Sequence, residues 1–360
     1  MSRLSDHGGT IFAVARSLGV APEQITDFSA SINPLGISSA VRLAITGSLD
    51  RLVHYPDSNH DRLKHALAAY HRLAPENFTI GNGSTELIYH IPLLLTAGTA
   101  LLISPSFSEY ASSLALHGWQ VGRLVLEAAR GFAVDLEQLE RRLVAGVDLL
   151  VLCNPGSPSG TLHPPEVIAR IAELCRITGT FLLLDEAFMD FTEQASAKHL
   201  LAGYERTIIL RSMTKFFGIP GLRLGYAISC PSLAEQLDLP GGPWRVNTLA
   251  LEAGVAALED VDHNRDTRVY VEHEREVLFG ELSRIPWLRP YPSTTNYLLV
   301  EITGGMTARQ LKELLLTQLI LIRDCANFEG LSDHFFRVAV RTKEENQRLL
   351  GCLTSVQMMY

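Results

Sequence analysis

Cysteine is scarce in this sequence and follows no pattern. Five occur among 360 residues: Cys153, Cys175, Cys230, Cys325 and Cys352. No pair has the short spacing of a zinc or redox motif, so we expect neither a metal site nor a disulfide framework. An odd, dispersed set of cysteines is typical of free thiols in a reducing compartment.

Long apolar runs are also missing. The longest, such as residues 91–95, fall far short of the about 20 residues that a membrane-spanning helix requires. The first ten residues, MSRLSDHGGT, contain no apolar core of the kind found in signal peptides. We therefore expect a cytoplasmic protein.

The chain carries no block of positive charge. With 31 lysines and arginines against 39 aspartates and glutamates, its net charge is −8, which does not favour a nucleic acid as partner. The apolar share of 47% is typical of a globular protein, and the length suits two or three packed units.

Short apolar runs alternate with helical patterns through the first two thirds of the chain. Runs such as LLVLC and FLLLD lack alternation, which indicates strands covered on both faces. Strands that alternate with helices predict an α/β fold with a mostly parallel sheet. The predicted strands are 100–104, 120–126, 148–153, 181–185, 207–211 and 224–229, and the predicted helices are 84–95, 108–117, 135–144 and 164–178.

The pattern changes after about residue 245. Helical stretches through 247–283 are followed by predicted strands at 296–302 and 335–340 and predicted helices at 307–318 and 343–358. We therefore predict three regions. They are an N-terminal arm with a segment that packs on the small domain (1–45), a large domain (46–245), and an interdomain helix with a smaller α+β domain (246–360).

Ligands in open α/β sheets bind at the carboxyl ends of the strands, so we searched the residues that follow each predicted strand. In GNGSTE, a glycine-rich turn with Gly83, Ser84 and Thr85 opens a helix and offers free N–H groups to a phosphate. The alternative is that Ser84 simply caps this helix. Asp185 ends an apolar strand, where a carboxylate must meet a cation or a donor. A helix cap or a metal ligand is the alternative for this residue.

The stretch LRSMTKFFGIPGLRLGY, residues 210–226, concentrates polar groups between two apolar runs. Ser212, Thr214 and Arg223 together suit a phosphate. A buried Lys215 would have a lowered pKa and could attack a carbonyl group. An aldehyde cofactor with a phosphate and a ring nitrogen would use these groups and Asp185. Pyridoxal 5′-phosphate is such a cofactor.

Taken in order, these motifs resemble those of the fold type I pyridoxal-phosphate enzymes, the superfamily of aspartate aminotransferase. The resemblance covers essentially the whole chain and rests on GNGST, NPGSPSG, DEAF and SMTK followed by RLG. It implies that Lys215 is the Schiff-base lysine and that Asp185 pairs with the ring nitrogen. It further implies that Gly83, Ser84, Thr85, Ser212, Thr214 and Arg223 hold the phosphate, that Tyr110 stacks on the ring, and that Tyr55 reaches the partner's cofactor in a homodimer.

Two families of this superfamily that take phosphorylated substrates are similar to the chain. It looks more like threonine-phosphate decarboxylases than histidinol-phosphate aminotransferases in three features: the DHGGT motif with His7 and Gly8, the segment 27–36, and Phe188 in place of a usual tyrosine. The segments LIRDCANFEGL and FFRVAVR extend this likeness. They imply Arg323 on the substrate phosphate and Arg337 on the substrate carboxylate, two groups that a guanidinium fork matches.

The alternatives for two of these residues are structural. Arg337 would otherwise be a surface residue on an edge strand. His7 would otherwise belong to a disordered terminus.

Two positions depart from the family pattern. The asparagine that usually donates to the phenolic oxygen of the cofactor is Ser157 here, and Ser31 stands where the decarboxylases often have an asparagine that faces the substrate. Serine is a shorter donor. We expect weaker cofactor binding or a changed choice of substrate.

We therefore predict a pyridoxal-phosphate-dependent decarboxylase. It would convert L-threonine O-3-phosphate to (R)-1-amino-2-propanol O-2-phosphate for cobalamin biosynthesis. The alternatives are decarboxylation of O-phospho-L-serine, a histidinol-phosphate or related aminotransferase, and a non-catalytic cofactor-binding module. The sequence names the substrate clamp but not its angle, which decides between loss of carbon dioxide and loss of a proton.

Overall fold

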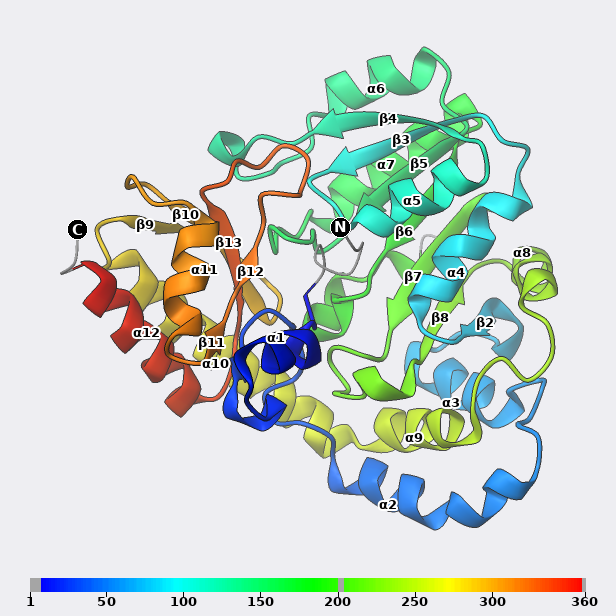
Figure 1. The fold of residues 1–360 in the computed structure, drawn as a ribbon. Coiled ribbons are helices and arrows are strands. Elements are labelled where there is room, and N and C mark those ends of the chain that lie inside the picture. Colours follow the sequence, from blue (N-terminus) through cyan, green and yellow to red (C-terminus); the bar gives the residue numbers. More distant parts are fainter. Residues whose placement is uncertain (1–7, 200–203, 358–360) are drawn as a thin grey trace.

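In the computed structural model, which describes residues 8–199 and 204–357, two β-sheets organise the molecule (Figure 1). One has seven strands and the other four, and two further short strands pair beside them. Within these residues, no helix is long and apolar enough to cross a membrane.

The seven-stranded sheet has the order β2-β8-β7-β6-β5-β3-β4. The five strands from β7 to β4 are parallel to one another, whereas β8 and β2 are antiparallel to their neighbours, so the predicted mostly parallel sheet is confirmed. Sequence analysis missed β2, which has only four residues and ends in a glycine. The bounds are β2 (Phe78–Gly81), β3 (Thr99–Ser104), β4 (Gln120–Val125), β5 (Leu149–Cys153), β6 (Phe181–Asp185), β7 (Thr207–Ser212) and β8 (Gly225–Ile228).

Both faces of this sheet are covered by helices, which explains why its strands lack alternation. In β5, Leu150 and Leu152 pack into one apolar cluster and Leu149 and Val151 into another. One face is covered by α4 (Ser84–His90), α5 (Ser108–Leu116) and α8 (Pro231–Asp238), and the other by α3 (Asp61–His71), α6 (Leu136–Val144), α7 (Pro165–Thr178) and α9 (Thr248–Glu259). The predicted helix 84–95 ends early, because Pro92 turns its last part into the 3-10 helix η5 (Ile91–Leu94).

The four-stranded sheet is antiparallel and has the order β12-β13-β10-β9. Its residues alternate between two environments: Leu298 and Val338 pack on helices, whereas Tyr297 and Phe335 pack toward the core of the larger sheet. Two of its strands were not predicted because they are only two or three residues long. The bounds are β9 (Leu288–Pro290), β10 (Tyr297–Ile302), β12 (Arg323–Asp324) and β13 (Phe335–Ala339), with α10 (Val261–Ser283), α11 (Ala308–Leu316) and α12 (Lys343–Gln357) on the helix-covered face. Residue 358, the predicted end of the last helix, lies outside the described residues.

The N-terminal part joins this smaller unit. After α1 (Ile11–Leu18), β1 (Thr26–Asp27) pairs in parallel with β11 (Ile320–Leu321), and the Ala339 N–H donates to Phe28 O at 2.9 Å. The next helix, α2 (Ser39–Gly47), then packs on α9 below the larger sheet (Figure 1). The predicted boundaries at residues 45 and 245 stay predictions.

Candidate active site

Polar residues converge at the carboxyl ends of the parallel strands. Asp185 is the last residue of β6 and lies opposite Cys153 at the end of β5 and Leu210 in β7. Ser212 ends β7, and Lys215 follows three positions later. The fold thus brings Asp185, Ser212 and Lys215 to one edge of the sheet, the edge at which open α/β sheets bind ligands.

Asp185 is buried, and two donors hold its carboxylate. The Tyr110 hydroxyl donates to Oδ2, and the Ala187 N–H donates to Oδ1 at 2.8 Å. Burial raises the pKa of Asp185, whereas the two donors and the nearby Lys215 lower it. Sequence analysis predicted that Tyr110 stacks on a cofactor ring; it did not foresee that the hydroxyl binds Asp185. The two hydrogen bonds therefore fix the position of the Asp185 carboxylate, which could pair with a cation.

Lys215 is half-buried among other cations. Burial, Arg337 and Arg223 lower the pKa of its amine to about 8, and Asp185 opposes this shift. Its backbone is fixed by Asn33, whose N–H donates to Lys215 O at 3.0 Å and whose side-chain amide donates to Phe216 O at 2.8 Å. The amine is thus more easily deprotonated than that of an exposed lysine. Sequence analysis missed Asn33, because nothing along the chain ties residue 33 to residue 215.

The predicted phosphate-binding residues pack closely around two glycines. Gly83 has a φ of +81°, and a Cβ there would lie 2.5 Å from Nη2 of Arg223. A Cβ at Gly225 would lie 2.3 Å from the backbone N of Ser84. The glycines in GNGST and RLG therefore let Arg223 and the start of α4 approach each other. The cap of α4 is Gly83 rather than Ser84, so the capping alternative for Ser84 is wrong.

Two hydroxyls lie beside this turn. Ser212 Oγ and Thr214 Oγ1 are 2.8 Å apart, and both side chains are buried. Arg223 donates to Pro220 O at 3.2 Å and adopts a left-handed φ of 57°. With the backbone of Ser84 and Thr85, these groups offer hydroxyl, amide and guanidinium donors, a set that suits a phosphate.

The two arginines predicted for the substrate are register partners on neighbouring strands. Arg323 of β12 lies opposite Arg337 of β13, so their side chains project from the same face of the sheet. Both are buried, with exposed fractions of 8% and 9%. Because β13 runs between β12 and β10, the alternative of an edge-strand surface residue for Arg337 is wrong.

Neutral oxygens bind both guanidinium groups. Arg337 donates to Ser29 O at 3.2 Å and to Ser157 Oγ at 3.3 Å. Arg323 donates to Asp324 O at 2.7 Å and to Asn327 Oδ1 at 2.8 Å. Arg323 also lines a cavity of about 460 Å³ together with residues of α11. The two groups thus point to different neighbours, although they start from paired positions.

Two aromatic rings complete the surroundings of Lys215 and Arg337. The Phe188 ring lies 6.0 Å from Lys215 Nζ and packs edge-on against Tyr297, with 4.9 Å between ring centroids. The Arg337 guanidinium lies 4.8 Å from the Tyr297 ring centroid, and the Tyr297 hydroxyl donates to Gly156 O at 2.7 Å. Sequence analysis missed Tyr297, because it starts a strand whose alternation predicts only burial.

The N-terminal segment contributes the last predicted residues. Ser31 is buried, and its hydroxyl has no hydrogen-bond partner among the described residues. Gly8 packs so closely on Ser29 that a Cβ would lie 2.3 Å from Ser29 O, and Arg337 Nη2 lies just beyond. His7 lies outside the described residues. A buried hydroxyl without a partner, on a segment whose Ser29 O accepts from Arg337, suits a polar ligand.

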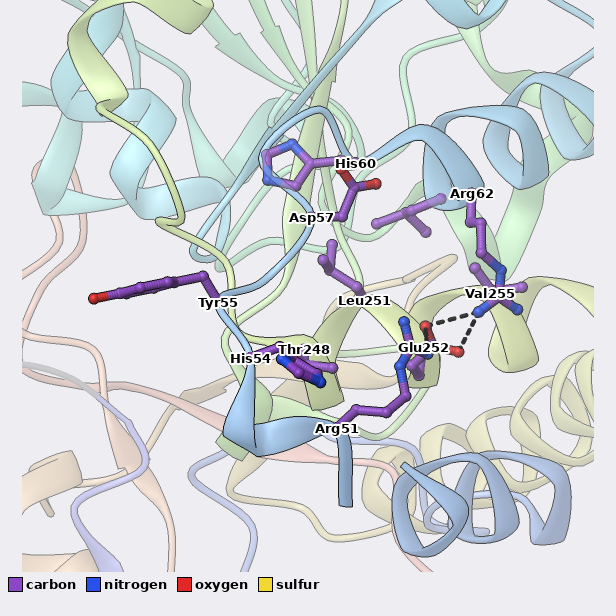
Figure 2. Close-up of a pocket in the computed structure, with 11 residues that line it drawn as sticks. Arg51, His54, Tyr55, Asp57, His60, Arg62, Thr248, Leu251, Glu252 and Val255 are labelled. Carbon is purple, nitrogen blue, oxygen red and sulfur yellow. Dashed lines mark hydrogen bonds and ion pairs between the residues drawn. The ribbon is translucent and has the colours of Figure 1, made fainter. Parts of the chain in front are cut away.

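Tyr55 lies away from this site. It is 78% exposed and stacks on Trp244 with ring centroids 4.6 Å apart. It borders a cavity of about 160 Å³, and Figure 2 shows its ring turned away from the other lining residues, among them His60 and Glu252. The exposed leucines and valine of the same stretch, Leu49, Leu52 and Val53, add apolar surface beside it.

The sequence matches a known family over most of its length. Residues 23–353 match the family described as aminotransferase class I and II. A curated relative, threonine-phosphate decarboxylase of Salmonella typhimurium, is 38% identical over 98% of this chain and 96% of its own.

Two solved structures share the fold. L-threonine-O-3-phosphate decarboxylase from Porphyromonas gingivalis superposes with a TM-score of 0.81 at 25% identity, covering 92% of this chain and 99% of that one. Histidinol-phosphate aminotransferase from Sinorhizobium meliloti, solved in complex with pyridoxal 5′-phosphate, has a TM-score of 0.85 at 25% identity and covers 96% and 94%. The fold alone therefore does not separate the two activities.

Proposed function

This chain belongs to the aminotransferase class I and II family, and we propose that it is a pyridoxal-phosphate-dependent decarboxylase of L-threonine O-3-phosphate. The product would be (R)-1-amino-2-propanol O-2-phosphate, used in cobalamin biosynthesis. The observation that carries the proposal is the pair of buried arginines on one face of the smaller sheet, Arg323 and Arg337, together with Lys215, whose pKa the charge of Arg337 helps to lower.

The residues present fit the cofactor. Arg223, the hydroxyls of Ser212 and Thr214, and the backbone of Gly83, Ser84 and Thr85 would hold its phosphate, because the close approach at Gly83 and Gly225 makes a turn with room for no side chain. Asp185 would bind the ring nitrogen, Lys215 the aldehyde carbon, and Tyr110 the ring. Bound pyridoxal phosphate withdraws electrons from the Cα of an amino acid.

The two arginines fit an amino acid that carries two acidic groups. We assign Arg337 to the carboxylate, because it lies beside Lys215 and Ser157, and Arg323 to the phosphate. Ser31, Gly8 and His7 would complete this side. The arginines would fix the rotation of the substrate about its N–Cα bond and so decide which bond at Cα breaks.

Lys215 would move the proton. With a pKa of about 8, a minor fraction of its amine is neutral at pH 7, so it could take a proton from the substrate ammonium group and deliver it to Cα after carbon dioxide has left. Phe188, Tyr297 and the apolar wall around them limit the access of water to this amine.

The test is release of carbon dioxide from O-phospho-L-threonine by the cofactor-loaded protein, without any 2-oxo acid. Stoichiometric release supports the proposal, and O-phospho-L-serine in the same assay measures how far Ser31 and Ser157 have changed the choice of substrate. Absence of release from a loaded protein contradicts it. Transfer of the amino group from L-histidinol phosphate to 2-oxoglutarate would then support the alternative, with which the shared fold is equally consistent.

We further propose a cytoplasmic homodimer in which Tyr55 reaches the phosphate of the partner's cofactor. Tyr55 is exposed beside the apolar residues Leu49, Leu52 and Val53, a surface that a second copy would cover. Sedimentation measures the mass directly. Substitution Tyr55→Phe is expected to weaken cofactor binding several-fold without changing that mass, whereas a monomer with unchanged cofactor affinity would contradict the assignment.

A further inference from the structure

A cluster of largely buried charges adjoins the candidate site, and neither the cofactor nor the substrate clamp uses it. We call it the Arg211 cluster: Arg211, Glu186, Asp190 and Glu193. Arg211 is 0% exposed and forms ion pairs with Glu186 at 3.0 Å and Asp190 at 2.8 Å, and a third with Glu193. Its environment raises the pKa of Arg211 well above the ordinary value, because three carboxylates outweigh the effect of burial.

The cluster adjoins the chemistry along the chain. Glu186 follows Asp185, and Arg211 precedes Ser212. The Glu186 N–H donates to Leu210 O at 2.8 Å, and its side chain accepts from Ser196 Oγ at 2.6 Å and the Ala197 N–H at 2.8 Å. One guanidinium therefore ties the ends of β6 and β7 to the 3-10 helix η7 (Met189–Ala195).

Phe188 lies between two of these anchors. Glu186 and Asp190 on either side of it bind the same guanidinium, while the Phe188 ring points to the other side, beside Lys215 and against Tyr297. Tyr297 in turn carries the Arg337 guanidinium on its face. The ion pairs of Arg211 with Glu186 and Asp190 thus hold the backbone on both sides of Phe188, and ring contacts lead from Phe188 through Tyr297 to the arginine proposed to orient the substrate.

Stability alone does not account for such a cluster. Well-packed apolar residues of the same volume often stabilise a protein as much as a buried ion pair, because burying charges costs desolvation energy. What ion pairs supply and apolar contacts do not is a fixed direction, since a guanidinium fork accepts carboxylates only at set angles.

We propose that the Arg211 cluster is a positioning device for the substrate clamp: by pinning both sides of Phe188, it fixes Tyr297 and the angle of Arg337. This rests on the proposed function for the identity of the substrate. Arg211, Asp190 and Glu186 are positioning residues, because they act through Phe188 and touch neither substrate nor cofactor. A loosened clamp lets the substrate rotate, which both weakens its binding and changes which bond breaks.

The test is a double-mutant cycle between Asp190→Ala and Phe188→Leu. Two quantities are measured: the dissociation constant of O-phospho-L-threonine on the cofactor-free protein, by calorimetry, and the ratio of carbon dioxide to 2-oxo acid product on the loaded enzyme. We expect Asp190→Ala to weaken binding about tenfold and to raise the share of 2-oxo acid. In the Phe188→Leu background the same substitution should change either quantity less than about twofold, because Phe188→Leu has already removed the ring contact with Tyr297.

The control is Leu139→Ala in α6, a buried apolar residue outside the Arg211 cluster whose truncation should lower stability without removing any of these ion pairs. Additive effects in the cycle would overturn the proposal. So would an Asp190→Ala protein that resembles Leu139→Ala, less stable but with unchanged binding and product ratio. If the unmodified protein releases no carbon dioxide, the proposed function fails, yet the calorimetric cycle still decides whether Asp190 and Phe188 act together.

Discussion

Arg211 of β7, in the larger sheet, and Arg337 of β13, in the smaller sheet, are both buried arginines, yet their partners differ. Arg211 meets three carboxylates. Arg337 has only neutral oxygens and an aromatic ring, and no described carboxylate lies within ion-pairing distance of it. A buried cation without a counter-ion costs folding energy. The difference separates an arginine whose charge is balanced inside the protein from one whose charge no described side chain balances.

The same contrast holds for two lysines. Lys198 is buried but ion-paired with Glu193, whereas Lys215 lies near Arg337 and Arg223 with a pKa lowered to about 8. A cation with carboxylate partners, Arg211, and one among other cations, Lys215, therefore lie only four positions apart in the sequence. Each substitution below should affect one class and leave the other unchanged.

The largest effect is expected from Lys215→Ala. The protein should lose the yellow colour of bound cofactor, and its rate of carbon dioxide release should fall by about 10⁴-fold, because the proton carrier is gone. Absorbance and a carbon dioxide assay measure this. Lys64→Ala, which removes a partly exposed lysine paired with Asp238, is the control and should change neither. A coloured, active Lys215→Ala protein would contradict the whole site.

Arg211→Met should act on stability. It leaves the buried carboxylates of Glu186 and Asp190 without their common cation and removes one of the cations paired with Glu193, so the free energy of unfolding should fall by about 3–5 kcal/mol. Denaturant titration of the cofactor-free protein measures this value. A loss below about 1 kcal/mol would mean that the carboxylates find other donors, and the contrast with Arg337 would no longer hold.

Arg337→Met should do the opposite. Removing a buried cation that lacks a counter-ion should leave the free energy of unfolding unchanged or higher. The value of kcat/KM for phosphothreonine should fall by about 30- to 5,000-fold, the equivalent of about 2–5 kcal/mol for a lost buried charge contact. Arg16→Met, on the exposed face of α1, is the control. A large loss of stability in Arg337→Met would show that this arginine is structural.

The smallest effect concerns pH. The pKa of Lys215 is about 8 in the folded protein and about 10.5 in the unfolded chain, so between these values the unfolded state binds more protons and stability rises with pH. Other groups titrate in this range, so the useful quantity is the difference in unfolding free energy between the unmodified protein and Lys215→Met. It should increase by about 1–2 kcal/mol from pH 8 to pH 10. If this difference in unfolding free energy did not change with pH, the pKa of Lys215 would be that of an ordinary exposed lysine, which would contradict the prediction.

The sequence predicted the chain's larger sheet well, because strands buried on both faces are continuous apolar runs and the chemistry follows their ends. Lys215, Asp185 and Arg223 stand out for the same reason. It did not predict that Arg323 and Arg337 face each other, since β12 is two residues long and gives no pattern. It also missed the Arg211 cluster, because Arg211 occurs in an apolar run and its partners are 18 to 25 positions away.

The pairing of Arg337 with Ser29 joins residues 308 positions apart in the chain. The first strand, β1, likewise pairs with β11, which lies near the C-terminal end of the sequence. During synthesis, the substrate side of the site therefore cannot form until almost the whole chain has left the ribosome. Loop closure over such a distance slows folding, and a chain that stops before β13 lacks Arg337 and cannot form this contact. Because of this connectivity, only a chain that contains both its first strand and β13 can assemble this side of the site.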